Sequence, residues 1–278
     1  MVTDIPVLNI SAGSIARAWE NSLCILHEHG CKIKTEYDNP NDPPSIDSTM
    51  ILTILDPLSE PMIHRELPGG LKDLQEYVME VCDGIKDHWI DTNSKTKWQY
   101  TYHKRFTEYF VDHSVSLPEN INQIELLIEK LVRNPYSRRA QAITWFVKDD
   151  NFLDDPPCIQ SLWGRIINDR FCMNVRIRSN DAYRAAMMNL FAFAILQKKI
   201  ACQISDRMGK DIKVGRLCWM ADSYHIYGKD LEEFEQRFFK AINKRTFAER
   251  TFNYCDVKPI MDEAIPVILA KVKRYDLR

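Results

Sequence analysis

One residue of this chain has both the type and the setting of a nucleophile. Cys158 ends the stretch Asp154-Asp-Pro-Pro-Cys158. Proline fixes the backbone and removes a hydrogen-bond donor, so the thiol follows a rigid, extended turn. A thiol attacks as the thiolate, which nearby positive charge favours. A lone cysteine is more often a small buried hydrophobe, so this stretch alone leaves both roles open.

Two pairs of adjacent residues could hold an anion. Arg138 and Arg139 follow a turn and could grip a phosphate, although such a pair is often only a solvated surface. Arg178 and Ser179 stand at a junction from strand to helix, where an anion could bind at the helix N-terminus. The sequence Ser-Asn-Asp at this junction is more typical of helix capping, because all three residues are good N-caps. The two interpretations of the junction are compatible.

Other polar side chains could recognise hydroxyl groups or a base. His225 and Tyr227 lie two residues apart, so an extended segment would place them on the same side, where they could bind a sugar hydroxyl. Asn189 is an amide inside an otherwise apolar helix. A buried amide needs hydrogen-bond partners, and these could be neighbouring backbone groups or a ligand.

The composition sets limits on the class of protein. The 278 residues are 45% hydrophobic, which is enough for a substantial core, and the net charge of −2 argues against a general nucleic-acid binder. No apolar run reaches the roughly 18 residues of a membrane span, and the N-terminus lacks the pattern of a secretory signal. Eight scattered cysteines without a CxxC pair predict free thiols in a reducing, cytoplasmic compartment.

Hydrophobic periodicity predicts the elements that must position these residues. Strands are expected around residues 50–55, 140–146 and 172–177, and helices over 71–85, 121–131 and 182–204. The last helix is apolar nearly all round, which predicts a central, buried element. The mixture favours an α/β or α+β fold without a regular βαβ rhythm. No glycine-rich dinucleotide or P-loop motif is present.

Taken together and in this order, the four stretches resemble the thymidylate synthase and deoxycytidylate hydroxymethylase superfamily. The family pattern is Ser-Arg-Arg, then Pro-Pro-Cys, then Arg-Ser-x-Asp-x-(Phe/Tyr) with an Asn eight residues after that Asp, then His-x-Tyr. Here these blocks are Ser137-Arg138-Arg139, Pro156-Pro157-Cys158, Arg178-Ser179-Asn180-Asp181-Ala182-Tyr183 with Asn189, and His225-Ile226-Tyr227. The match is best over about residues 134–228 and is closest to the archaeal-type branch. It implies one domain over residues 1–278, with a large mixed β-sheet packed by helices.

The resemblance implies a role for each matched residue. Cys158 would attack C6 of a pyrimidine nucleotide as a thiolate, and C5 would then capture the methylene of a reduced pterin. Arg178 would stabilise that thiolate. The residues expected to bind the nucleotide are Arg138, Arg139, Arg178 and Ser179 at the 5′-phosphate, Asn189 at the base, and His225 and Tyr227 at the sugar 3′-hydroxyl. Asp181 would bind the pterin ring, and no metal is implied.

The resemblance also implies a proton-relay carboxylate and a tyrosine near the nucleophile. Glu76 is the candidate carboxylate and Glu80 the runner-up. Both lie off the apolar stripe of their helix, so a solvated face is an equally good interpretation. Tyr102 matches the tyrosine of the family's Val-Tyr-Gly.

Some positions depart from the family pattern. The histidine that usually follows the catalytic cysteine is Ile159, a usual glutamine is Ile177, and a usual Leu-Gly pair is Arg184-Ala185. The C-terminus lacks the apolar tail that closes over folate. The co-substrate could therefore be methylenetetrahydrofolate or methylenetetrahydromethanopterin.

The main hypothesis is methylation of dUMP to dTMP by a homodimer whose active sites are shared across the interface, with Arg138 and Arg139 reaching the partner's phosphate. The alternative is a nucleotide hydroxymethylase of the same fold acting on dCMP or CMP, in which water traps the exocyclic methylene. The dCMP enzymes usually carry Asp at the base-reading position, so Asn189 favours uracil. A third hypothesis, a catalytically inactive nucleotide-binding protein, is less consistent with Cys158.

Overall fold

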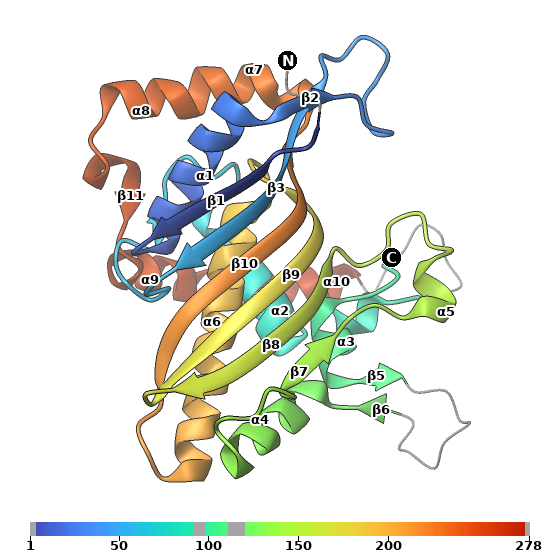
Figure 1. Ribbon diagram of the computed structural model, residues 1–278, viewed down its shortest axis with the longest axis vertical. Coiled ribbons are helices and arrows are strands. Elements are labelled where there is room, and N and C mark those ends of the chain that lie inside the picture. The colour runs from blue at the N-terminus through green and yellow to red at the C-terminus, as the bar shows by residue number, and fades with distance from the viewer. Residues whose placement is uncertain (1–3, 92–97, 111–119, 276–278) are drawn as a thin grey trace. The chain divides into compact units, whose positions relative to one another are not determined.

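The computed structural model describes residues 4–91, 98–110 and 120–275 (Figure 1). They fall into two compact units, each built from three segments of the chain. Unit 1 comprises Met1–Gly70, Arg176–Phe191 and Arg216–Pro259, and unit 2 comprises Leu71–Val175, Ala192–Gly215 and Ile260–Arg278. Neither unit is a contiguous stretch of sequence, and a single domain over the whole chain stays a prediction.

Unit 1 is a mixed sheet with helices. Its strands run in the order β1-β3-β10-β9, with β2 also pairing with β3; β1 is parallel to β3, whereas β2 and β10 are antiparallel to it. The strands are β1 (Val7–Ala12), β2 (Cys31–Ile33), β3 (Ser45–Ile54), β4 (Ile63–His64), β11 (Thr251–Phe252) and parts of β9 (Arg170–Asp181) and β10 (Lys213–Ile226). The helical elements are α1 (Ile15–His29), the start of α6 (Ala186–Met208), η2 (Gly228–Asp230), α7 (Leu231–Phe234), η3 (Glu235–Phe239), α8 (Lys240–Lys244), η4 (Ala248–Arg250) and the start of α9 (Tyr254–Glu263).

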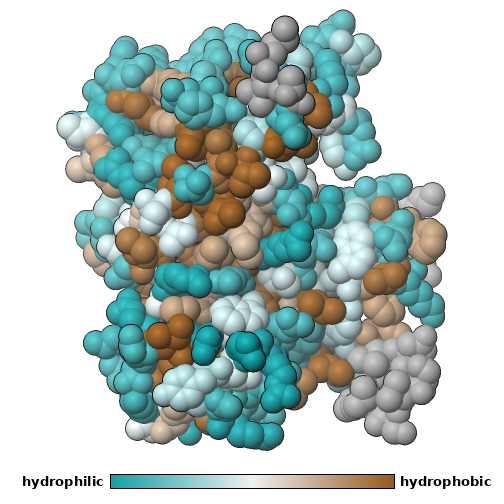
Figure 2. Space-filling view, viewed as in Figure 1, coloured by the Kyte–Doolittle hydropathy of each residue, from teal (hydrophilic) through white to brown (hydrophobic). Residues whose placement is uncertain are grey.

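The two faces of the unit 1 sheet differ in burial. Helix α1, which begins after the N-cap Ser14, packs on one face, and side chains alternate along each strand. Met50, Leu52 and Ile54 are therefore fully buried, while Thr49, Ile51 and Thr53 on the opposite face keep partial exposure. Figure 2 shows this second face toward the viewer, with apolar side chains gathered over β1 and β3.

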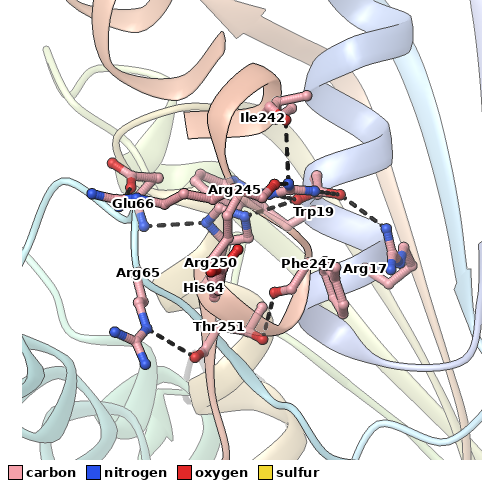
Figure 3. Close-up of polar contacts among 12 residues, drawn as sticks. Arg17, Trp19, His64, Arg65, Glu66, Ile242, Arg245, Phe247, Arg250 and Thr251 are labelled. Atoms are coloured by element: carbon pink, nitrogen blue, oxygen red, sulfur yellow. Dashed lines mark hydrogen bonds and ion pairs between the residues drawn. The ribbon is translucent and has the colours of Figure 1, made fainter. Parts of the chain in front are cut away.

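A buried charge network ties α1 to β4 and to the segment around β11 (Figure 3). Glu20 accepts hydrogen bonds from Nε2 of His64 at 3.0 Å and from Nε and Nη2 of Arg250 at 2.8 and 3.0 Å. The Glu66 backbone N–H donates to Nδ1 of His64 at 3.2 Å, so His64 carries its proton on Nε2. Burial raises the pKa of Glu20, but these donors outweigh it and lower the pKa to about 2. Glu20 is therefore ionised throughout the physiological range.

Unit 2 contains β7 and β8 with parts of β9 and β10, in the order β10-β9-β8-β7, and most of the long helices. Its elements are α2 (Leu71–Asp83), η1 (Asp87–Trp89), α3 (Tyr102–Thr107), β5 (Tyr109–Phe110), β6 (Asn120–Ile121), α4 (Gln123–Arg133), β7 (Gln141–Ile143), α5 (Val147–Asp150), β8 (Ile159–Ile167), most of α6 and α10 (Ile265–Tyr275). Met79, Trp89, Ile268 and Val272 form a small core that joins α2, η1 and α10. The side of α2 that contributes Met79 to this core is apolar, so the other side of the helix can carry polar groups.

The expected elements are largely confirmed. The strand around 50–55 is part of β3, and the helices over 71–85, 121–131 and 182–204 correspond to α2, α4 and α6. The strand expected over 140–146 is limited to Gln141–Ile143, and the one over 172–177 extends to Arg170–Asp181. None of the helices formed by the described residues is long and apolar enough to cross a membrane.

The expectation of a helix N-terminus at Arg178 and Ser179 is wrong. Both residues lie inside β9, and α6 begins only at Ala186. Asp181, at the end of β9, instead stabilises the turn that follows. Its Oδ1 accepts hydrogen bonds from the backbone N–H groups of Tyr183 at 3.1 Å and Arg184 at 2.7 Å.

Candidate active site

The Cys158 thiol lies at the end of a rigid turn in unit 2, immediately before β8. Pro157 is buried and Cys158 is half-buried. The Gln160 side chain donates to the carbonyl oxygens of Pro157 at 2.7 Å and Cys158 at 3.4 Å, which holds the turn against the first residues of the strand. A half-buried thiol on a fixed backbone can be reached by a ligand while its orientation stays defined.

The Tyr102 side chain contacts this turn. The Tyr102 hydroxyl accepts a hydrogen bond from the Ile159 backbone N–H at 3.4 Å, and its ring lies 5.6 Å from that of Tyr100. Burial raises the pKa of Tyr102 and of Tyr77 well above the ordinary range, and negative charge on Cys158 adds to both shifts. Both phenols are therefore neutral and can donate hydrogen bonds.

The two candidate carboxylates on α2 are buried, so the interpretation of a solvated face is wrong. Glu76 is 6% exposed and Glu80 is 8% exposed. Lys86 reaches Oε1 of Glu76 at 3.0 Å and Oε2 of Glu80 at 2.8 Å, and Lys271 from α10 contacts both oxygens of Glu76 at 2.8 and 3.0 Å. The sequence periodicity missed this because the polar side of α2 is covered by a lysine and a second helix rather than by water.

Arg138 and Arg139 are exposed on the connection between α4 and β7. Their backbone carbonyls accept hydrogen bonds from Trp163 Nε1 at 3.1 Å and Lys130 Nζ at 3.4 Å. Neither guanidinium group makes an ion pair with a described residue. Both side chains can therefore bind an external anion.

The other predicted nucleotide-binding residues lie in unit 1. Arg178 and Ser179 are half-buried near the end of β9, and Asn189 lies in the first turns of α6 with 8% exposure. The prediction that Asn189 is a buried amide is confirmed. The neighbouring Asn180 has a structural contact instead, because its Oδ1 accepts the Trp219 indole N–H at 2.9 Å.

A β-bulge determines the face on which His225 lies. Strict alternation along β10 would place His225 on the same face as Trp219 and Ala221, under α1. The pairing with β3 shifts by one residue between Ala221 and Tyr224, so the later side chains change face. His225 is thereby paired with Asp47, while Tyr224 packs into the α1 side and hydrogen-bonds there.

The side chains around His225 define its tautomer. Ser223 Oγ donates to Oδ2 of Asp47 at 2.9 Å, so it accepts from Nδ1 of His225 at 3.0 Å. Burial lowers the pKa of His225, which outweighs the opposing charges of Asp47 and Asp38. The imidazole is therefore neutral, and its buried Nε2 is an acceptor with no hydrogen-bond partner among the described residues. The Tyr227 ring lies 4.6 Å away on the same side, as predicted from the two-residue spacing.

Asp181 is a half-buried carboxylate, and one of its oxygens makes no hydrogen bond with a described residue. Oδ1 caps the turn described above, and Oδ2 has no partner among the described residues. Burial, together with the charge of Asp230, raises its pKa to about 6 in spite of the capping N–H groups. Arg184 is turned toward Asp230 and Glu233, with contacts of 2.7 and 2.6 Å, so this departure from the family pattern is an ion-pair position.

The polar partners that sequence reasoning missed are Tyr77, Tyr100, Lys86, Asp47 and Ser223. Lys86 is separated from Glu80 by the helix end, and Asp47 is far from His225 in the sequence, so neither spacing carried a signal. Ser223 lies two residues before His225, and this spacing was the one detectable hint.

Comparisons with known proteins show the family and the fold to which this chain is similar. Residues 23–263 match the sequence profile of the family described as Thymidylate synthase. A Methanosarcina barkeri protein named "Putative thymidylate synthase" is 28% identical over 236 residues, covering 84% of this chain and 95% of its own length. The similarly named protein of Methanocaldococcus jannaschii is 29% identical over 239 residues, with 84% and 96% covered. The thermostable thymidylate synthase A from Bacillus subtilis shares the fold, with a TM-score of 0.60 at 16% identity, covering 81% of this chain and 84% of that one.

These matches assign the chain to the enzymes that transfer a one-carbon group, the methyltransferases. The profile covers most of the sequence, and the chain belongs to the thymidylate synthase family. Members of this family bind a nucleotide monophosphate and use a co-substrate of the methylene-folate type.

Proposed function

We propose that this enzyme methylates dUMP to dTMP, with a methylene-tetrahydropterin as the one-carbon donor and Cys158 as the nucleophile. The observation that carries the proposal is the half-buried Cys158 thiol on its turn, where the neutral phenol of Tyr102 contacts the next residue of the chain. A thiol in this setting can add to an electron-poor double bond while the phenol donates a hydrogen bond to the product of that addition.

The chemistry that we assign to Cys158 is an addition to C6 of the pyrimidine. The sulfur forms a bond to C6, the electrons of the C5=C6 double bond move onto C5 and the C4 carbonyl, and C5 then bonds to the methylene carbon. The pterin supplies this methylene group and, in thymidylate formation, the hydride that reduces it. We assign to Arg178 the role that the resemblance implies, which is to stabilise the thiolate, because positive charge favours that form.

Recognition of the nucleotide is assigned to groups with complementary chemistry. Arg178 and Ser179 bind the 5′-phosphate, and the buried amide of Asn189 reads the base with one donor and one acceptor. The unpaired Nε2 of His225 accepts a hydrogen bond from the sugar 3′-hydroxyl, with Tyr227 beside it. A buried acceptor without a partner is costly, so a ligand hydroxyl at this position is favoured.

Asp181 is assigned to the pterin ring. Its free Oδ2 can accept hydrogen bonds from ring N–H donors, whether the ring belongs to a folate or to a methanopterin. Accepting two such donors requires the ionised carboxylate.

This assignment predicts a pH-dependent affinity for the pterin. The raised pKa of Asp181, about 6, means that the carboxyl takes up a proton as the pH falls through that value. KM for the pterin is expected to rise about tenfold for each further pH unit, while KM for dUMP changes little. The measurement is a pH profile of both KM values between about pH 5 and about pH 8.

The control for this prediction is Asp181→Asn. This variant is expected to show a high pterin KM without pH dependence. It is also expected to be more stable than the wild type at about pH 8, because the raised pKa means that ionisation of Asp181 opposes folding. If KM for the pterin still rose at low pH in Asp181→Asn, the titrating group would be a different residue.

We also propose a homodimer in which each active site uses arginines from the partner subunit. Arg138 and Arg139 are exposed and without an ion-pair partner among the described residues. The uncovered face of the unit 1 sheet carries apolar side chains, including Val7 at 66% exposure and the half-exposed Ile51 and Met220. Such a face is suited to burial against a second copy.

A single set of assays tests the proposed reaction. Purified enzyme is incubated with methylenetetrahydrofolate or methylenetetrahydromethanopterin and with dUMP, dCMP or CMP in turn, and products are identified by mass. Formation of dTMP supports the proposal and names the pterin. Hydroxymethylated cytidylate would establish the alternative reaction, and the absence of turnover with every pair would favour a nucleotide-binding protein.

Asn189→Asp is expected to shift preference from uracil toward cytosine. An ionised carboxylate faces the O4 acceptor of uracil without a donor, whereas it accepts from the amino group of cytosine. Because Asn189 is 8% exposed, burial favours the protonated acid, which can also donate to N3 of cytosine. The mismatch is expected to cost ~1–3 kcal/mol, or roughly ten- to hundredfold in the ratio of kcat/KM for dUMP and dCMP.

Gln197→Glu on the same helix is the matched control for this variant. Gln197 is fully buried and holds the carbonyl oxygens of Phe171 and Gly215, so its replacement disturbs α6 without altering the base-reading amide. It is expected to reduce both activities and leave their ratio unchanged. A ratio that does not move in Asn189→Asp would remove this residue from base recognition.

A further inference from the structure

The carboxylates of Glu76 and Glu80 are bound differently, although they lie one turn apart on α2. Both oxygens of Glu76 are engaged, by Lys271 at 2.8 and 3.0 Å and by Lys86 at 3.0 Å. Glu80 uses only Oε2, which accepts from Lys86 at 2.8 Å, and its Oε1 makes no hydrogen bond with a described residue. Of these two carboxylates, Glu80 is the one with an oxygen that makes no hydrogen bond with a described residue and can accept a proton without displacing a lysine.

The position of Lys86 is fixed by the turn that ends α2. Gly84 adopts φ +64°, a left-handed conformation that ends the helix and folds the chain back along it. A Cβ on Gly84 would lie 2.2 Å from the His103 ring and 2.5 Å from Asp87, so only glycine fits. Lys86 is 8% exposed, and its ammonium lies 5.2 and 5.1 Å from the ring centres of Trp89 and Trp98. These rings leave it little freedom other than to contact the two carboxylates.

The electrostatic surroundings distinguish the two carboxylates further. Tyr77 is affected by the charges of both Glu80 and Cys158, which raise its pKa after the larger effect of burial. Burial raises the pKa of Glu80, and the charges of Glu76 and Asp87 add to this effect. Lys86 lowers the pKa but does not outweigh the other effects. Asp87 is itself paired with His103 at 2.6 Å and bonded to Thr101. Glu80 is thus a buried carboxylate held by Lys86 through one oxygen, in surroundings whose other charges disfavour its ionised form.

We propose that Glu80, rather than Glu76, is the proton-relay carboxylate of the reaction, and that Lys86 is the positioning residue that holds it with one oxygen free. This inference rests on the proposed function. When C5 of the methylene-bearing intermediate loses its proton, the proton passes through water to Oε1 of Glu80. The electrons of the C5–H bond form the exocyclic double bond, and the pterin nitrogen leaves with its bonding pair. The charge of Glu76 is balanced by Lys271 and Lys86, and the role of Glu76 is to hold Lys86 in place.

The two lysines provide a matched pair of variants. Lys86→Met removes the cation from Glu80, whereas Lys271→Met removes a lysine that contacts Glu76 alone and whose side chain is 57% exposed. In Lys86→Met the acid limb of the kcat–pH profile is expected to move up by about one pH unit or more, with KM for dUMP nearly unchanged. In Lys271→Met the limb is expected to stay within about 0.3 unit of the wild type. Lys86→Arg should restore the limb toward its original position.

A second pair of variants keeps the inference testable if Lys86→Met does not fold. Glu80→Gln is expected to lower kcat at least about a hundredfold and to abolish the acid limb, whereas Glu76→Gln retains it. The inference is overturned if Glu76→Gln loses the limb and Glu80→Gln keeps it, or if both lysine variants move the limb equally. Failure of the wild type to turn over any pyrimidine nucleotide would instead refute the proposed function.

Discussion

Cys158→Ser is expected to lower kcat for dUMP methylation by at least about a thousandfold, or about 4 kcal/mol in activation free energy. A serine hydroxyl stays protonated near neutral pH and adds poorly to C6, whereas the thiol it replaces can ionise. The phosphate, sugar and base contacts come from other residues, so the Kd for dUMP should change by no more than about twofold. Steady-state turnover and calorimetric titration with dUMP measure the two quantities separately.

The chain offers a control for loss of a thiol as such. Cys202 is exposed on α6, and Cys202→Ser is expected to keep full turnover. Substantial activity in a clean Cys158→Ser preparation would exclude the covalent mechanism proposed for Cys158. Loss of dUMP binding together with turnover would indicate a disturbed turn rather than a missing nucleophile.

Mixing inactive Cys158→Ser chains with weakly active Arg139→Ala chains is expected to restore activity. If each site combines Cys158 of one chain with Arg139 of its partner, one site of a mixed dimer carries both changes and the other carries neither. With random exchange, half of the dimers are mixed and each has one intact site, so activity should reach about one quarter of the wild type. The measurement is kcat/KM for dUMP before and after subunit exchange.

The arginine variants alone provide the reference for this experiment. Each Arg139→Ala site loses a charge-assisted hydrogen bond to phosphate, at roughly 1.5–3 kcal/mol, or about ten- to hundredfold in kcat/KM. Mixing Cys158→Ser with a double variant Cys158→Ser/Arg139→Ala should give no recovery. An active monomer in light scattering at micromolar concentration, or a mixture no more active than its components, would be incompatible with shared sites.

The sequence by itself determined the parts of this protein that depend on local order. Proline before Cys158 fixed the turn that carries the thiol, and the periodicity of α2, α4 and α6 predicted those helices closely. The apolar surroundings of Asn189 predicted its burial correctly. Such features follow from neighbours along the chain, which a single sequence displays directly.

Only the tertiary structure decided which polar groups meet. His225 faces Asp47 because a bulge in β10 reverses the alternation of side chains. No sequence pattern between Ala221 and Tyr224 predicts the extra residue that the bulge inserts. Glu76 and Glu80 look solvated on a helical wheel, yet Lys86 folds back over them after Gly84, and α10 brings Lys271 from nearly two hundred positions away. The local sequence determines which residues share a helix face. The register between strands and the packing of distant helices determine which groups cover that face. They therefore also determine which carboxylate keeps an oxygen without a hydrogen bond.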